Sequence, residues 1–331
     1  MLGFGLILPL EIPLEHGVDQ YDKLLNVAAD HARDLHALCT DVSAVIFPSA
    51  IVPPTEATIN AVSAKLLQIV SDIEAALLPR GAQQPPLTWQ TLARSGFLRE
   101  PDLVDFVLAR VAEDRLESKV DGTDSNLSTL LLDHADGNIA EAAQTLLAAE
   151  SLHRHALGNS HLTLTPELLH KLCWRVAAAL EVVHGARQPE VVAQVRAIIT
   201  AYSEANRAQA AARKILHFSS DADRLAFVKP DVAGIHLHVA AMSAALDLDH
   251  DHVLRLIDAG SCAPYAIMLA ATGTPKSDAV EAIYLFRKDA LTPREAGILD
   301  AGYESLDRAD ALAEIGKWAS ARTNFLAFGQ P

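Results

Sequence analysis

Apolar residues recur along most of the chain at the three- and four-residue spacing of amphipathic α-helices. Beyond Gly17, one such face consists of Tyr21, Leu24, Leu25, Ala28, Ala32, Leu35 and Cys39. A second face follows Thr55, a residue that can cap a helix, and consists of Ile59, Val62, Leu66, Ile69, Val70, Ile73 and Leu77. Each pattern predicts a helix that packs by one side, with polar residues on the other.

Start signals delimit further helices. Pro101 and Pro189 stand at the first-turn position that proline prefers, and Thr165 to Glu167 combines a cap, a proline and an acid at the positive end of the helix dipole. Thr292 to Glu295 is a capping box with proline at the first helical position. Shorter apolar segments predict helices at residues 89–95, 127–132 and 139–147. No run alternates over five or more residues with β-branched enrichment, so no strand is predicted.

Many short helices joined by short loops predict an all-α, multi-helical fold. The helices could stack in pairs as an irregular HEAT-like α-solenoid or form a compact bundle, since the sequence has no clean repeat period. Half of the residues are apolar, which supplies ample material for a core. The stretch Gly81 to Pro86 is a candidate linker between an N-terminal helical segment, residues 1–80, and a repeat-like region, residues 87–331. One continuous array is the alternative.

The net charge of the chain disfavours two classes of partner, and its cysteines indicate a cellular compartment. The formal net charge of −15 disfavours nucleic acid and anionic membranes, which would be repelled. The longest basic cluster, Arg207 to Lys214, is diluted by alanines, and we expect it to be a solvated helix face. Met1 to Leu10 is apolar but too short to span a membrane, so we expect an arm that packs on the body. Three separated cysteines without a CxxC pair indicate a reducing compartment, and we expect a cytoplasmic protein with structural thiols.

Fourteen histidines are the compositional oddity, and the densest group is Asp249, His250, Asp251 and His252. Carboxylates and imidazoles at this density could hold a transition metal, which makes these four the candidate metal ligands. Asp249 can instead cap a helix, which spreads the next three side chains about 100° apart around the first turn. The sequence favours that second interpretation, a solvated acidic first turn. His236 and His238 are two apart and diverge on a helix, as do His153 and His155.

Signatures of catalysis are absent from the sequence. It has no phosphate-binding G-x-x-x-x-G-K, no G-x-S-x-G, no H-E-x-x-H and no strand-linked G-x-G-x-x-G. A helix-turn-helix resemblance between Gly137 and Leu157 provides Arg154 as the only fixed positive charge of its second helix, too little for a DNA reader. The sequence therefore predicts no catalytic residue and no cofactor, and it favours a protein that is not an enzyme.

Several segments are similar to the uncharacterised bacterial family catalogued as domain of unknown function 2336. They are Lys65 to Leu77 (KLLQIVSDIEAAL), Leu146 to Ser151 (LLAAES), Thr165 to Leu180 (TPELLHKLCWRVAAAL) and Leu246 to Gly273. The resemblance rests on helix-packing patterns and spans most of the chain. It implies an all-helical, repeat-like protein and brings no catalytic or binding residues with it.

Taken together, the residues favour a helical scaffold that binds another protein, basic or neutral, in a regulatory role. We expect the two ends, Met1 to Leu10 and the C-terminal Trp318, Phe325, Leu326 and Phe328, to be buried on the body or across a contact between two copies of the chain. The alternative is a metal-binding or metal-sensing protein that uses the His and Asp clusters. An enzyme without a recognisable motif is a third possibility.

Overall fold

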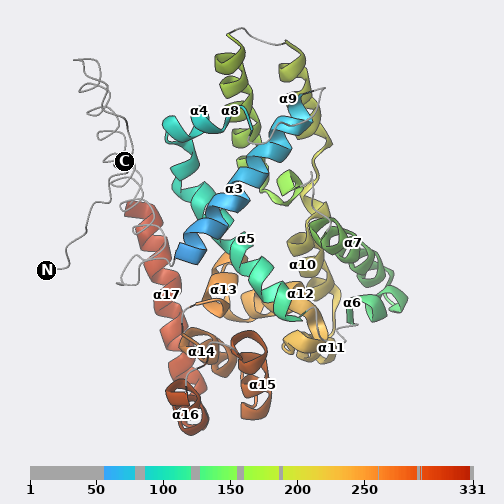
Figure 1. The fold of residues 1–331 in the computed structure, drawn as a ribbon. Coiled ribbons are helices and arrows are strands. Elements are labelled where there is room, and N and C mark those ends of the chain that lie inside the picture. The colour runs from blue at the N-terminus through green and yellow to red at the C-terminus, as the bar shows by residue number, and fades with distance from the viewer. Residues whose placement is uncertain are drawn as a thin grey trace, which may run out of the picture. The chain divides into compact units, whose positions relative to one another are not determined.

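A computed structural model describes residues 56–78, 86–120, 127–154, 160–185, 189–259, 261–288, 291 and 293–328. The chain divides into two units after Pro53, and every described residue belongs to the second unit (Figure 1). The predicted helix from Tyr21 to Cys39 and the predicted arm Met1 to Leu10 lie outside the described residues. So do the side chains of residues 319–331, which include three of the C-terminal apolar residues.

Every regular element within the described ranges is a helix and none is a strand, which confirms the predicted all-α, multi-helical class. The α-helices are α3 (Glu56–Leu77), α4 (Trp89–Arg94), α5 (Pro101–Val120), α6 (Leu127–Leu130), α7 (Gly137–Arg154), α8 (Pro166–His184), α9 (Pro189–Ala201), α10 (Ala208–Phe218), α11 (Asp221–Phe227), α12 (Pro230–Leu246), α13 (His250–Ile257), α14 (Ala263–Ala271), α15 (Lys276–Arg287), α16 (Pro293–Gly302) and α17 (Arg308–Phe328). Single 3₁₀ turns are η2 (Phe97–Arg99), η3 (Leu131–Asp133), η4 (Ser160–Thr163), η5 (Glu204–Asn206) and η6 (Tyr303–Ser305). Among these elements no helix has both the length and the apolar character needed to cross a bilayer.

Three helix starts that the sequence marks are observed in the described residues, whereas the proposed cap Thr55 lies outside them. Thr165 caps α8, where its Oγ1 accepts a hydrogen bond from the backbone N–H of Leu168 at 3.3 Å. The same helix ends at Gly185, whose φ of 70° is left-handed and suits glycine. Pro101 and Pro189 begin α5 and α9 as predicted. The proposed cap of α16 at residue 292 lies outside the described residues.

Buried apolar side chains form three clusters. The first joins the C-terminal half of α5 to α12 and the helices that follow it, up to α17. The second joins α3, α4, the N-terminal half of α5, α8 and α9. The third joins η3, α7, α10, α11 and α12. Cys173 and Cys262 are buried in the second and first clusters, so the structural interpretation of these two thiols is confirmed, and burial raises the pKa of the Cys173 thiol to about 11.

Helices distant in sequence pack directly on one another. α3 contacts α8, α14 contacts α17, and α5 contacts α12, α13 and α15. In a solenoid each repeat contacts only its neighbours, so this connectivity is that of the bundle alternative. α3 and α5 also share the second cluster across the candidate linker Gly81 to Pro86.

α12 bends at its start and belongs to two clusters. Gly234 has φ 74° and ψ 166° inside the helix, a conformation open mainly to glycine. Beyond the bend, Ile235 and Val239 face the first cluster, whereas Leu237 and Ala240 face the third. The bend thereby sets the direction of the segment that carries His236 and His238.

His238 is fully buried and makes two polar contacts inside the protein. Its Nε2 lies 2.9 Å from the hydroxyl of Tyr265, and its Nδ1 lies 3.3 Å from the carbonyl oxygen of Phe227. A neutral ring with its proton on Nδ1 satisfies both contacts, since Nδ1–H donates to Phe227 and Nε2 accepts from Tyr265. Burial lowers the pKa of His238 to about 4, so the ring is uncharged at neutral pH.

This depressed pKa predicts loss of stability in mild acid. The unfolded chain's histidine titrates near pH ~6.5, so between about pH 6.5 and 4 the unfolded state binds more protons than the folded state. Stability is therefore full above about pH 6.5 and falls as the pH drops towards 4. We expect His238 to lower the free energy of unfolding by about 2 kcal/mol between pH ~7 and ~5, measured by urea titration. His238→Gln should reduce this dependence by the contribution of His238, whereas His217→Gln, at an exposed site, should leave it unchanged. Equal pH dependence in all three proteins would contradict the assignment.

Candidate functional site

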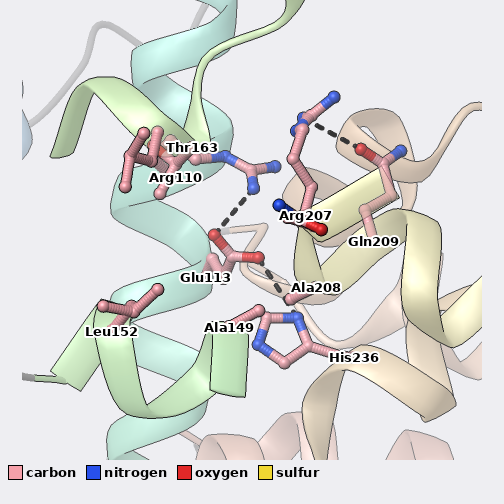
Figure 2. Close-up of a pocket in the computed structure, with 11 residues that line it drawn as sticks. Arg110, Glu113, Ala149, Leu152, Thr163, Arg207, Ala208, Gln209 and His236 are labelled. Atoms are coloured by element: carbon pink, nitrogen blue, oxygen red, sulfur yellow. Dashed lines mark hydrogen bonds and ion pairs between the residues drawn. The ribbon is translucent and has the colours of Figure 1, made fainter. Parts of the chain in front are cut away.

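A polar pocket lies where α5, α7, α10, α12 and η4 meet (Figure 2). It holds about 550 Å³ of empty space, part of which is open to solvent. Its polar wall includes Arg110, Glu113, Arg207, Gln209 and His236, and its apolar wall is Ala149, Leu152 and Leu162. Buried charged side chains that converge beside an apolar wall make the pocket the leading candidate site.

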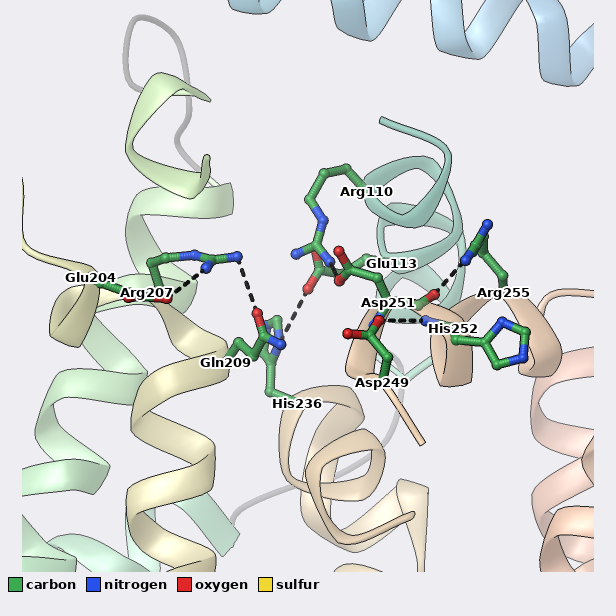
Figure 3. Close-up of polar contacts among 10 residues, drawn as sticks. All are labelled: Arg110, Glu113, Glu204, Arg207, Gln209, His236, Asp249, Asp251, His252 and Arg255. Atoms are coloured by element: carbon green, nitrogen blue, oxygen red, sulfur yellow. Dashed lines mark hydrogen bonds and ion pairs between the residues drawn. The ribbon is translucent and has the colours of Figure 1, made fainter. Parts of the chain in front are cut away.

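Two opposite charges of α5 are buried in this wall. The side chains of Arg110 and Glu113 are only 5% and 4% exposed, and Arg110 Nη1 lies 2.8 Å from Glu113 Oε2. A second guanidinium nitrogen of Arg110 pairs with Asp251 at the start of α13, and Glu113 Oε1 lies 3.4 Å from His236 Nδ1 (Figure 3). Burial opposes the charge of Arg110, but the nearby carboxylates outweigh it and raise the pKa of this guanidinium. Arg110 therefore stays ionised, and the contacts of Arg110 and Glu113 tie α5 to α13 and α12.

The four candidate metal ligands of the sequence do not converge on one point. Asp249 is exposed and caps α13, accepting hydrogen bonds from the backbone N–H of Asp251 at 3.0 Å and of His252 at 3.2 Å, so the capping interpretation is confirmed. Asp251 pairs with Arg110 instead. Across the described residues, no group of three or more His, Cys, Asp or Glu side chains could hold a metal ion.

His250 corrects the expectation of a solvated first turn. Its ring is fully buried, and neither ring nitrogen has a hydrogen-bond partner among the residues that the structure describes. Burial, followed by the charges of Arg110, His236, Arg213 and Arg207, holds the pKa of His250 well below its usual value.

Arg207 corrects a second expectation, that the basic segment Arg207 to Lys214 is a solvated face. Its side chain is 7% exposed, because Arg207 precedes α10 at the end that faces the pocket. Its guanidinium donates to Gln209 Oε1 at 3.1 Å and lies 3.4 Å from Glu204 (Figure 3). Farther along α10, Arg213 is exposed and Lys214 pairs with Glu141 at the surface, as expected of a solvated face.

The paired histidines of α12 diverge as predicted. His236 faces Glu113 in the pocket, whereas His238 faces Tyr265 in the core. What the sequence did not indicate is that both are buried. The side chains of the other pair, residues 153 and 155, lie outside the description. The helix-turn-helix resemblance also has no counterpart in the described part of that segment, because Gly137–Arg154 is one uninterrupted helix.

A second feature is a set of exposed apolar side chains that flank members of the third cluster in sequence, here called the α6–α11 surface. Its side chains are large, apolar and exposed: Leu130, Leu132, Phe218, Leu225 and Val232. Each lies one or two residues from a buried member of the third cluster. α6 and α11 both lie beside α12, as Figure 1 shows. Hydrogen bonds from Ser220 at the start of α11 hold the pKa of Asp223 below its usual range.

No family model, curated protein or solved structure matches the chain. The similarity to domain of unknown function 2336 therefore remains a prediction. Of the four segments that carry it, Lys65 to Leu77, Leu146 to Ser151 and Thr165 to Leu180 belong to α3, α7 and α8, and Leu246 to Gly273 includes α13 and α14. Their apolar residues pack in all three clusters. Those similarities thus lie mainly in packing faces, and Ala149 of the second segment also lines the pocket.

The buried ion pair predicts an asymmetric response to mutation. Glu113→Ala removes the best-shielded partner of Arg110, so we expect the free energy of unfolding to fall by about 3 kcal/mol in chemical denaturation. Glu141→Ala, which removes a partner of Lys214 from a solvent-exposed pair, should have a far smaller effect. Comparable losses in the two variants would show that the pocket pair is as well solvated as the surface pair.

Proposed function

We propose that the chain is a helical scaffold that binds another protein, in a regulatory role, through the α6–α11 surface. The observation that carries the proposal is the exposure of large apolar side chains there, with Leu130 67% and Leu225 73% exposed. Burying one such side chain stabilises a complex by roughly 1.5–3 kcal/mol. Apolar surface that gathers in one region, rather than scattering singly, is typical of protein-binding sites.

Charge around this surface favours a particular kind of partner. Asp133, Asp221 and Asp223 are close in sequence to its apolar side chains, although Arg224 pairs with Asp221, and the whole chain carries a net charge of −15. A partner that presents apolar side chains together with Lys or Arg would complement both properties. A second copy of this chain would juxtapose like charges, so we favour a different protein over a homo-oligomer.

Two double variants test the proposal by affinity capture from the native host. Leu130→Ser with Leu225→Ser should lose the captured partner, because both substitutions remove apolar contact area. Val182→Ser with Val183→Ser makes the same kind of change at exposed apolar positions of α8 and should retain it. All four positions are exposed, so neither variant should shift the melting temperature greatly. Retention of the partner by both variants, or its loss from both, would place the interface elsewhere.

Added salt should slow the association if acidic residues steer a basic partner. The Debye length shrinks from about 10 Å at 0.1 M salt to about 3 Å at 1 M, which screens long-range attraction. We expect the association rate constant of the captured partner, measured by surface plasmon resonance, to fall over this range while the dissociation rate constant changes little. An association rate that is independent of salt would contradict the acidic rim as a steering element.

A further inference from the structure

The pocket contains a positive charge that its surroundings neutralise only weakly. Arg207 is nearly buried, yet its ionic partner Glu204 is 58% exposed and its carboxylate lies 3.4 Å away. Solvent screens such a contact strongly. Gln209, the other partner of Arg207, is uncharged. A buried guanidinium in this setting retains most of its capacity to attract an anion.

The start of α10 adds to this potential at the same place. The first backbone N–H groups of a helix have no partner within the helix, and the residue before α10 is Arg207, whose side chain makes no capping hydrogen bond. Asn206, Arg207, Ala208 and Gln209 all line the pocket, so this helix end meets it directly. Helix starts attract anions through their N–H groups and the helix dipole.

Arg110 lies across the pocket from this helix start, and its ion pairs differ from those of Arg207. Glu113 and Asp251 both neutralise it, while its buried Nε has no hydrogen-bond partner among the described residues. The carboxylate of Glu113 is itself held between Arg110 and His236. The unmatched charge of the pocket is therefore that of Arg207, which suits one negative charge better than the two of a phosphate dianion.

The opposite wall of the pocket is apolar. Leu152 and Leu162 are exposed at its mouth, and Ala149 lies beside them. We propose that this pocket binds a small organic carboxylate, whose carboxylate group lies against Arg207 and the first N–H groups of α10 and whose apolar body lies against Leu152 and Leu162. This ligand site is separate from the α6–α11 surface, and its test does not depend on the proposed protein partner.

Isothermal titration calorimetry of the full chain tests the ligand class. Hexanoate should bind saturably with one site per chain. Acetate, which lacks the apolar body, and inorganic phosphate, which carries more charge and no apolar body, should each bind at least tenfold more weakly. Hexylammonium, with the same body and the opposite charge, should show no binding. Absence of saturable hexanoate binding, equal binding of hexylammonium, or tighter binding of phosphate would each overturn the proposal.

Gln209→Glu tests the position of the carboxylate without emptying the pocket. The substitution preserves side-chain shape, places a carboxylate beside Arg207, and adds an acid in the first turn of α10, where acids stabilise helices. We expect an unchanged or higher melting temperature together with at least tenfold weaker hexanoate binding. Arg207→Gln should weaken binding equally, and Arg207→Lys should restore part of it.

A matched control makes the same chemical change at the equivalent helix position. Gln90 is the second residue of α4, just as Gln209 is the second residue of α10. The side chain of Gln90 is exposed. Gln90→Glu should leave hexanoate affinity at the wild-type value. If Gln209→Glu also bound hexanoate with wild-type affinity, the carboxylate would not lie at α10 and the site would be wrong.

Discussion

The buried ion pair of Arg110 and Glu113 constrains the arrangement of the helices around it. Removing a charge from water costs several kcal/mol, and partners must be held in good geometry to offset it. Glu113 supplies one partner from the same helix, Asp251 comes from α13, and His236 from α12 contacts the carboxylate. These contacts fix α12 and α13 against α5. Two of these helices also connect the apolar clusters, because α5 belongs to the first and second clusters and α12 to the first and third.

The helices themselves follow from local sequence. The apolar faces of α3 and α8 recur with helical spacing, and Thr165 and Asp249 can be recognised as caps from a few residues of context. α5 is different, because it is buried nearly all round, with apolar side chains in both the first and second clusters. In such a helix Arg110 and Glu113 resemble the polar face of an ordinary amphipathic helix. Periodicity alone therefore cannot show that they are buried.

Most of the candidate site could not be predicted from the sequence, because its interacting residues are far apart along the chain. Arg110 and Asp251 are 141 residues apart, and Arg115 and Asp258 are 143 apart. Nothing local indicates such pairings. The histidine-rich segment was a candidate site because its histidines and aspartates are adjacent in sequence. In the structure, the positive groups that lower the pKa of His250 belong to α5, α12 and α10 with the residue before it. One local signal was available: α10 begins after an arginine rather than after a capping Ser, Thr, Asp or Asn, which leaves its first N–H groups without a side-chain acceptor.

The net charge of the chain is negative, whereas the charge around Arg207 in the pocket is positive. The two charges act on binding partners over different distances. A formal charge of −15 disfavours anionic partners at long range, where the whole surface acts as one body. At physiological ionic strength the Debye length is about 8 Å, so a ligand inside the pocket responds mainly to the groups that line it. α10 starts at the pocket with Arg207 and ends at the α6–α11 surface with Phe218. Its eleven residues extend about 16 Å at 1.5 Å per residue, roughly twice that Debye length. A positive pocket and an acidic protein-binding surface can therefore coexist at the two ends of one short helix, with little electrostatic interference between them.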